Sequence, residues 1–284
     1  LSALAIERNV DFKTGMAKFE STSKLLLTNQ DACDVLEFKN VIIASGSRPT
    51  SLPFAPNSRK ILDSTSALKL EEIPKRLFII GGGIIGLEMA CVYAELGSQV
   101  TIIELSSNLL NGVDKDLVRP LERKLKNKLE SIYKSTKVIA IDETPEGFIL
   151  TLEGDLAPEK LACDAILVAT GRVPNTELLN LDKIGVFTDD QGFIRVDNQL
   201  RTNIANVFAV GDVTGNPMLA HKSTYQGKVA AEVLAGMKTI YDAKAVPSVA
   251  YTDPEVAWIG HTESMGMIKG RDLKISSFPW SACR

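Results

Sequence analysis

The chain has 284 residues, 45% of them hydrophobic and 24% charged, which is the composition of a globular protein of about two domains. Its 32 basic and 35 acidic residues leave a formal net charge of −3, so the charge gives no reason to expect binding to nucleic acid or to an anionic membrane. No apolar run approaches the ~20 residues of a membrane span, and the spacing of the four cysteines matches no zinc site. We therefore expect a cytoplasmic protein that has no metal site and crosses no membrane.

The predicted elements alternate between strands and helices. Residues 10–29 show short strand patterns, and the apolar runs at 41–44, 77–80, 100–103, 165–169 and 207–210 predict buried parallel strands. Residues 85–96, which stop before Gly97, and residues 218–234 predict helices. This order, with short glycine turns, is typical of an α/β sheet that is covered by helices on both faces.

Two other patterns lie between these runs. Leucines recur every four residues from 117 to 129 and predict an amphipathic helix that starts near Asp114, with Pro120 expected to bend it or to delay its start. The period then changes to two, which predicts a β-hairpin between strands at 138–141 and 148–152. Cys91 in a predicted helix and Cys163 beside a predicted strand are expected to be buried as small hydrophobic residues.

One short motif occurs twice. Ala44-Ser-Gly-Ser-Arg-Pro49 and Ala169-Thr-Gly-Arg-Val-Pro174 each follow an apolar strand. The repeat indicates two related domains, each closing with the same turn.

The strongest local signal is a glycine motif between a predicted strand and a predicted helix. Gly81, Gly83 and Gly86 form GxGxxG, in which the glycines allow a tight turn, close approach to a pyrophosphate and packing of the helix against the strand. Glu104 ends the next strand, where a carboxylate binds ribose hydroxyls and repels a 2′-phosphate. The motif therefore favours NAD over NADP, and the alternative is a glycine turn that binds nothing.

A second candidate site follows the strand at 207–210. Asp212 lies at the carboxyl end of that strand, where open α/β sheets bind ligands, and a helix begins a few residues later. The aspartate could bind the hydroxyls of a sugar or polyol. From the residues alone, a capping aspartate in a strand-to-helix loop is the favoured interpretation.

Several of these segments occur in the order seen in one protein family. They are Ala-Ser-Gly-Ser-Arg-Pro, Gly-Gly-Gly-Ile-Ile-Gly-Leu-Glu, Ala-Thr-Gly-Arg-Val-Pro-Asn, Phe-Ala-Val-Gly-Asp-Val and Met-Leu-Ala-His-Lys. Together they resemble the pyridine nucleotide–disulfide oxidoreductases, and most of all the bacterial dihydrolipoamide dehydrogenase branch. The segment from Tyr251 to Gly260 resembles the start of that family's dimerisation domain.

The resemblance implies NAD and FAD as cofactors and assigns residues to each. Glu88 resembles the glutamate beside the nicotinamide and flavin, Val138 a residue near the NAD adenine, and Gly171 one near the nicotinamide half. The implied NAD residues are Gly81, Gly82, Gly83, Ile84, Ile85, Gly86, Glu88, Glu104, Val138 and Gly171.

For FAD, the resemblance places the ribityl chain on Asp212 and a flavin contact on the backbone N–H of Ala220. Ala17 matches a backbone contact to the adenine, and His221 resembles a position near the flavin, although it could equally be a packed helix residue. The implied FAD residues are Ala17, Asp212, Met218, Leu219, Ala220 and His221.

The family's architecture implies two Rossmann-like domains and part of a third domain. Residues 1–50 and 177–247 would form an incomplete FAD-binding domain, 51–176 an NAD-binding domain, and 248–284 the start of an α+β dimerisation domain. The implied reaction converts dihydrolipoamide and NAD+ to lipoamide and NADH through FAD and a redox disulfide. The implied protein is a homodimer, and its substrate is carried by an acyltransferase subunit of a 2-oxo acid dehydrogenase complex.

The family's Cys-x4-Cys pair and catalytic His-Glu couple have no counterpart in this sequence, which also lacks an initiator Met. We therefore interpret the chain as an internal fragment that contains no catalytic residue, is inactive alone and holds FAD poorly. The alternatives are a related enzyme, such as glutathione reductase, mercuric reductase or a soluble transhydrogenase, and a non-catalytic nucleotide-binding protein.

Overall fold

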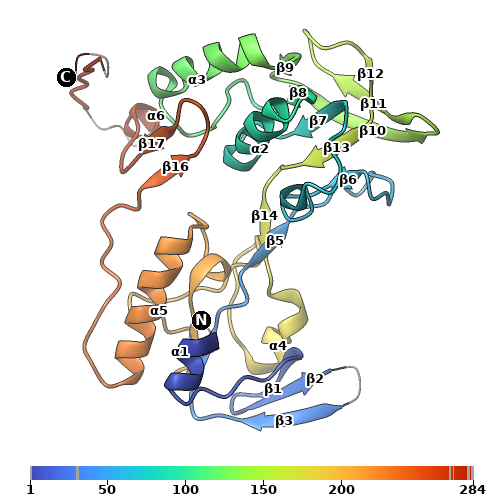
Figure 1. The fold of residues 1–284 in the computed structure, drawn as a ribbon. Coiled ribbons are helices and arrows are strands. Elements are labelled where there is room, and N and C mark those ends of the chain that lie inside the picture. Colours follow the sequence, from blue (N-terminus) through green and yellow to red (C-terminus); the bar gives the residue numbers. More distant parts are fainter. Residues whose placement is uncertain (1, 30–31, 269, 271, 280–281, 283–284) are drawn as a thin grey trace. The chain divides into compact units, whose positions relative to one another are not determined.

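The structure is a computed structural model that describes residues 2–29, 32–268, 270, 272–279 and 282 (Figure 1). The chain divides into two compact units. The first unit comprises Leu1–Arg48 and Val173–Ala243, and the second unit comprises Pro49–Arg172 and Lys244–Arg284. Residues 49–172 are therefore an insertion in the sequence of the first unit.

The second unit is built on a parallel sheet with the strand order β6-β13-β7-β8-β9. The strands are β6 (Ile61–Leu62), β7 (Arg76–Ile80), β8 (Gln99–Ile103), β9 (Ser131–Tyr133) and β13 (Ala165–Val168). From β7 the chain runs outward to β8 and β9 and then returns to the other side of β7 as β13. The strand order thus reverses between β7 and β13, and open parallel sheets bind ligands at such a point.

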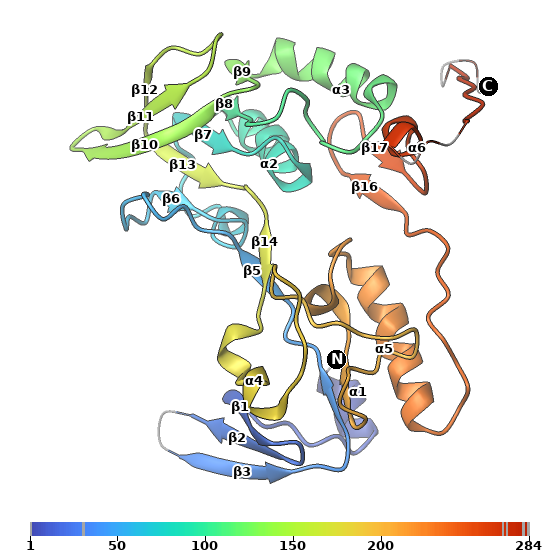
Figure 2. The same ribbon diagram turned by 180° about the vertical axis from the view of Figure 1, so that it is seen from behind.

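Side chains of the central strands alternate between two cores. Leu77 and Ile79 of β7 face α2 (Ile84–Glu95) and α3 (Lys115–Lys128), whereas Phe78 and Ile80 face an antiparallel sheet. That sheet consists of β10 (Lys137–Thr144), β11 (Gly147–Glu153) and β12 (Lys160–Cys163), seen from behind in Figure 2. The α/β class and the predicted hairpin are confirmed, but in the described part of the chain helices cover one face of the parallel sheet and the antiparallel sheet covers the other.

Helix α3 differs from its prediction in two details. It begins at Lys115 with Asp114 as its N-cap and contains Pro120, so the proline does not delay the start. Leu121 and Leu125 are fully buried as predicted, but Leu117 is 42% exposed. The buried position in the first turn belongs to Val118, because a helix of 3.6 residues per turn rotates away from a strict four-residue repeat.

The chain after Lys244 belongs to the second unit. Strands β16 (Ser248–Ala250) and β17 (Val256–Trp258) form an antiparallel pair, followed by α6 (Glu263–Ile268). Ala250 and Val256 join the core that lies over α2 and α3. That this segment begins a dimerisation domain stays a prediction.

The first unit contains an antiparallel sheet and a pair of parallel strands. Its antiparallel strands are β1 (Met16–Ser21), β2 (Lys24–Thr28) and β3 (Cys33–Glu37), and its parallel strands are β4 (Val41–Ile43) and β15 (Val207–Ala209). The helices are α1 (Ser2–Glu7), α4 (Leu181–Ile184) and α5 (Ala220–Leu234). Phe208 and Val210 form a core with α5, whereas Val207 and Ala209 pack against the side of α4 and β1.

The repeated motif forms a two-stranded ribbon. Strand β5 (Ser47–Pro49) from the first copy pairs with β14 (Arg172–Pro174) from the second copy (Figure 1). The chain leaves the first unit within β5 and returns to it within β14. The two similar segments are therefore hydrogen-bonded neighbours.

In the described part of the chain, no helix is long and apolar enough to cross a membrane. Cys91 and Cys163 are buried, as predicted, and Cys33 is exposed. Cys283 lies outside the described residues.

Candidate functional site

Three glycines at the junction of β7 and α2 are closely packed within the protein, and two of them face backbone atoms. Gly81 has a φ of +115°, and a Cβ there would lie 2.3 Å from the carbonyl oxygen of Ala169. A Cβ at Gly86 would lie 2.0 Å from the carbonyl oxygen of Gly81. Gly82 is buried against Leu109, whose side chain would be 2.6 Å from a Cβ at this position. A side chain at Gly81 or Gly86 would collide with backbone, whereas one at Gly82 would have to displace the Leu109 side chain.

Gly83 is different, because nothing in the protein requires a glycine there. It is the N-cap of α2 with a φ of −80°, which every residue adopts, and a Cβ would have no neighbour within 4 Å. Beside it lie the first N–H groups of α2, which have no helical carbonyl to bond, and the positive end of the helix dipole. Open space next to such donors suits a diphosphate.

Glu104 is directed at the glycine turn. Its Oε2 accepts a hydrogen bond from the backbone N–H of Gly82 at 2.5 Å, and its Oε1 accepts one from the N–H of Ser106 at 2.6 Å. These two donors hold the carboxylate in one orientation, and a carboxylate has further lone pairs for ligand hydroxyls. The acid and the glycines, predicted to act together, are therefore close in space.

The other residues assigned to NAD are more dispersed. Gly171 is exposed, has a φ of +133° and lies two residues after Ala169, which touches the turn. Glu88, in the second turn of α2, accepts a hydrogen bond from the backbone N–H of Tyr251 at 2.8 Å. Val138 is 7% exposed within the core of the β10–β12 sheet, so any contact with a ligand has to come from its backbone.

Ile84 and Ile85 begin α2 and are partly buried against the core that α2 shares with α3.

Sequence reasoning missed the loop that follows Glu104. The N–H of Leu110 donates to the carbonyl oxygen of Gly82 at 2.9 Å, and Leu109 and Leu110 are buried. This loop closes the glycine turn on one side, and a Leu-Leu pair outside any periodic pattern gives no signal of that role.

The first unit contains an open cavity of about 420 Å³ near Asp212. It is lined by Ala44, Gly46, Val210, Gly211, Asp212, Ser223 and Thr224. These residues come from the carboxyl ends of β4 and β15 and from the first turns of α5. Ser47, next to the lining, donates from its Oγ to Asp212 Oδ2 at 2.6 Å.

The residues assigned to FAD lie partly around this cavity. Asp212 is in its wall, and Ala220 is the first residue of α5. Helix α5 begins two residues later than predicted, because Leu219 has the extended backbone of an N-cap and leaves Met218 in the preceding loop. The first helical bond runs from the Ser223 N–H to the Leu219 carbonyl, which leaves the Ala220 N–H among the unsatisfied donors of the helix start.

Two other assigned FAD residues lie away from the cavity wall. His221 is exposed on the first turn of α5. Ala17 lies on β1 opposite Leu27 and is not part of the lining.

Two buried polar side chains of α5 were also missed, because a Lys and a Gln in an amphipathic helix predict exposure. Lys222 and Gln226 are each 5% exposed. Lys222 Nζ donates to the carbonyl oxygen of Gly215, and Gln226 Oε1 accepts from the N–H of Gly211 at 2.8 Å. Burial lowers the pKa of Lys222, and the nearby Asp212 carboxylate opposes that change.

These features define a class of protein. A parallel sheet carries a glycine turn and an acid where its strand order reverses, and an aspartate at a second strand end lines a cavity. That combination is typical of α/β proteins that bind dinucleotides. Residues 3–227 match the family described as pyridine nucleotide-disulphide oxidoreductase, and the chain belongs to this family.

Similar proteins agree with this assignment. The chain is 45% identical over 284 residues to a dihydrolipoyl dehydrogenase of Vibrio parahaemolyticus, covering 99% of this chain and 60% of the relative. It is 46% identical over 288 residues to a dihydrolipoyl dehydrogenase of Haemophilus influenzae, covering 99% of this chain and 59% of the relative. The chain thus spans about three fifths of the length of these relatives.

A solved structure has the same fold over most of the chain. The HOCl-induced flavoprotein disulfide reductase RclA of Escherichia coli matches with a TM-score of 0.86 at 29% identity. The match covers 98% of this chain and 63% of the solved one. The resemblance to a family of flavoprotein disulfide reductases, first seen in short motifs, is confirmed.

Proposed function

We propose that the chain supplies the NAD site and part of the FAD site of a flavoprotein disulfide oxidoreductase that oxidises dihydrolipoamide with NAD+. The observation that carries this proposal is the hydrogen bond from the Gly82 N–H to the Glu104 carboxylate. This bond supports the proposal because it joins the acid that we assign to the ribose to a turn that leaves open space at a helix start. The names of the Vibrio and Haemophilus relatives support dihydrolipoamide as the substrate.

In the proposed NAD site, the backbone from Gly81 to Gly86 and the start of α2 hold the diphosphate. The Glu104 carboxylate accepts from the adenine-ribose hydroxyls, and its charge rejects the 2′-phosphate of NADP. Glu88 and Gly171 contribute to the nicotinamide half, and Val138 lies near the adenine. The fit is supported by Gly83, whose missing side chain serves no contact within the protein.

In the proposed FAD site, Asp212 accepts from hydroxyls of the ribityl chain. The unsatisfied N–H of Ala220 donates to the electron-rich edge of the flavin, where the helix start stabilises negative charge. Met218, Leu219 and His221 border this position, and Ala17 contributes a backbone contact to the adenine. Bound FAD supplies two-electron transfer between a dithiol–disulfide pair and NAD+.

The complete enzyme would act as a homodimer in the cytoplasm. Its dihydrolipoamide would be carried by an acyltransferase subunit of a 2-oxo acid dehydrogenase complex. The segment after Lys244 would contribute to the dimer interface. The redox cysteines would come from outside the 284-residue chain, because its sequence contains no Cys-x4-Cys.

A titration of the chain with NAD and with NADP tests the proposal. We expect NAD to bind more tightly than NADP, and Glu104→Ala to weaken NAD binding at least about tenfold by removing the acceptor of the ribose hydroxyls. Glu104→Gln keeps an oxygen for one backbone N–H but removes the charge, so it should weaken NAD binding and improve NADP binding.

The matched control is Glu143→Ala. Glu143 accepts one side-chain hydrogen bond, from Ser58 Oγ at 2.8 Å, and lies in the same unit on β10. The Glu143→Ala variant should bind NAD with the affinity of the unsubstituted chain. Equal affinity for NAD and NADP, or unchanged NAD binding by Glu104→Ala, would contradict the proposed nucleotide site.

A further inference from the structure

The Asp212 carboxylate is oriented by a hydrogen bond from within the protein. Ser47 Oγ donates to its Oδ2 at 2.6 Å, the short distance of a charge-assisted hydrogen bond. The two groups come from strand ends that are far apart in sequence, one after β4 and one after β15. Because a carboxylate is planar, the bond to Oδ2 also limits the direction in which Oδ1 and its lone pairs point.

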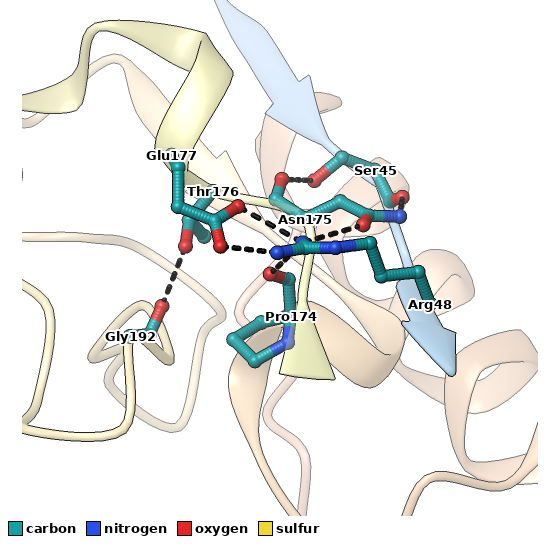
Figure 3. A network of polar contacts seen from close by, with 7 residues as sticks. All are labelled: Ser45, Arg48, Pro174, Asn175, Thr176, Glu177 and Gly192. Atoms are coloured by element: carbon teal, nitrogen blue, oxygen red, sulfur yellow. Dashed lines mark hydrogen bonds and ion pairs between the residues drawn. The ribbon is translucent and has the colours of Figure 1, made fainter. Parts of the chain in front are cut away.

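Asn175 is hydrogen-bonded to the backbone that precedes Ser47, and Figure 3 shows its contact with Ser45. Its backbone N–H donates to the carbonyl oxygen of Gly46 at 2.9 Å, and its Nδ2 donates to the carbonyl oxygen of Ser45 at 2.9 Å. Ser45 Oγ donates in return to the Asn175 carbonyl oxygen at 2.8 Å. Three bonds therefore fix the two residues before Ser47, one of which, Gly46, lines the cavity.

Arg48 sets the orientation of the Asn175 amide. Its Nη1 donates to Asn175 Oδ1 at 3.2 Å, so that Nδ2 is the group that faces Ser45. Arg48 is itself held by Glu177, with Nη1 to Oε2 at 2.9 Å and Nη2 to Oε1 at 2.5 Å, as Figure 3 shows. A planar guanidinium with two bonds to a carboxylate has little rotational freedom.

The turn that carries Asp212 is held from the other side by α5. Gln226 Oε1 accepts from the Gly211 N–H at 2.8 Å, and Thr214 Oγ1 donates to the Gly211 carbonyl oxygen at 2.8 Å. Lys222 Nζ donates to the carbonyl oxygen of Gly215. Both side chains are buried, where an unmade hydrogen bond is costly, so the turn from Gly211 to Gly215 has one favoured position.

We infer that Ser47 is a positioning residue that presents Asp212 to a polyol chain, and that Asn175 acts through Ser47 from outside the cavity. The inference rests on the proposed FAD site and names the residues whose hydrogen bonds hold the carboxylate at its polyol end. A site whose groups are already ordered binds its ligand more tightly, because binding then costs less conformational entropy.

The experiment is a titration of the full 284-residue chain with FAD, followed by flavin fluorescence. Ser47→Ala should weaken FAD binding about tenfold, the effect of one hydrogen bond to a charged group. Ser47→Thr keeps the hydroxyl and should restore the affinity to within about threefold, which a purely structural role of Ser47 in β5 would not produce. Asn175→Ala should weaken binding in the same direction.

Two controls match these substitutions. Ser58→Ala also removes a hydroxyl that donates to a carboxylate, and Asn203→Ala removes an amide that bonds the backbone at Gly185 and Phe187; neither residue lines the cavity. Both should bind FAD as the unsubstituted chain does. Thermal unfolding of each variant shows whether it is folded. If Asn175→Ala is unfolded, the comparison of Ser47→Ala with Ser47→Thr still decides the test.

The outcomes separate the inference from the proposed function. FAD binding by Ser47→Ala as tight as that of the unsubstituted chain, or equally weak binding by Ser47→Ala and Ser47→Thr, overturns the positioning role while leaving the FAD site in place. No FAD binding by the unsubstituted chain overturns the FAD site, and the role of Ser47 with it.

Discussion

At the residue scale, the glycines at the junction of β7 and α2 separate into two kinds. Gly83 leaves open space at an ordinary φ, whereas Gly86, inside α2, has no room for a Cβ beside the carbonyl oxygen of Gly81. We expect Gly83→Ala to leave the unfolding temperature unchanged and to weaken NAD binding at least about tenfold, because the methyl group would occupy space that a diphosphate needs. Calorimetric titration and thermal unfolding measure the two effects.

Gly86→Ala is the contrasting substitution. Its Cβ would lie 2.0 Å from the carbonyl oxygen of Gly81, so we expect a loss of about 2 kcal/mol or more in the free energy of unfolding. If Gly83→Ala destabilised the fold as much as Gly86→Ala, the open space beside Gly83 would not be a ligand site.

Cys163 provides a chemical test of burial. Desolvation raises the pKa of its thiol to about 12, so the reactive thiolate is nearly absent at neutral pH. We expect iodoacetamide at about pH 8 to label the exposed Cys33 and to spare Cys163, as read by peptide mass spectrometry. Both should be labelled in denaturant, and labelling of Cys163 in the folded chain would contradict its place in the core.

The residue scale also shows where sequence reasoning ends. Gly81, Gly83, Gly86 and Glu104 could be predicted because one strand–turn–helix unit and the next strand supply all of them. Ser47 and Asn175 could not, because their contacts join segments separated by more than a hundred residues, and no local pattern predicts such pairs.

At the scale of elements, the apolar runs predicted the parallel strands well, because a strand buried on both faces needs apolar residues at every position. The short helix α1 was missed, since its residues are mostly exposed and it has no buried face to create a pattern. The start of α5 was predicted at Met218, whereas the extended backbone of Leu219 places it at Ala220.

The junction between β12 and β13 depends on a charged pair. Asp164 Oδ1 accepts from Arg76 Nε at 3.1 Å and from Nη2 at 2.6 Å, and its Oδ2 accepts from the Arg76 N–H at 2.8 Å. The hydrogen bonds from the Arg76 side chain lower the pKa of Asp164 below its usual value near 3.8. Its stabilising effect is therefore present above about pH 4 and is lost as the pH falls through the lower pKa of the folded state.

We expect Asp164→Asn to lower the free energy of unfolding by roughly 1 kcal/mol at neutral pH, since the pair is partly exposed. The difference from the unsubstituted chain should shrink below about pH 4, as the aspartate becomes protonated. Thermal unfolding across this pH range measures it. Asp253→Asn, which removes an exposed ion pair with Lys124, should have a smaller effect, and a pH-independent difference for Asp164→Asn would contradict the assignment.

At the scale of the whole molecule, the sequence predicted the α/β class and the order of its segments. It did not predict that residues after Lys244 pack on α2 and α3, because this needs the pairing of β16 with β17 and a core shared with Val118 and Leu121. Composition does not change along the chain, so no boundary between the two units could be recognised from it.

The proposal that this chain holds the NAD site but not the redox cysteines makes a prediction for the 284-residue chain. We expect it to bind NAD but to form no NADH from dihydrolipoamide, because its sequence has no Cys-x4-Cys pair to accept electrons from the dithiol. FAD should bind weakly enough to be lost during gel filtration. NADH formation, followed by its absorbance, would contradict the predicted inactivity.

The ribbon of β5 and β14 has a consequence for how this architecture could be rebuilt. The outgoing and returning strands are adjacent, and the backbone bond from the Thr50 N–H to the Gly171 carbonyl at 3.0 Å continues the contact beyond them. Residues 49–172 therefore begin and end at the same place in the fold, on two paired strands. Joining Arg48 to Val173 through a tight turn would close the first unit on itself, but Ala250 and Val256, which pack with α2 and α3, would then lose their core, so a replacement module has to supply a matching surface for the chain after Lys244.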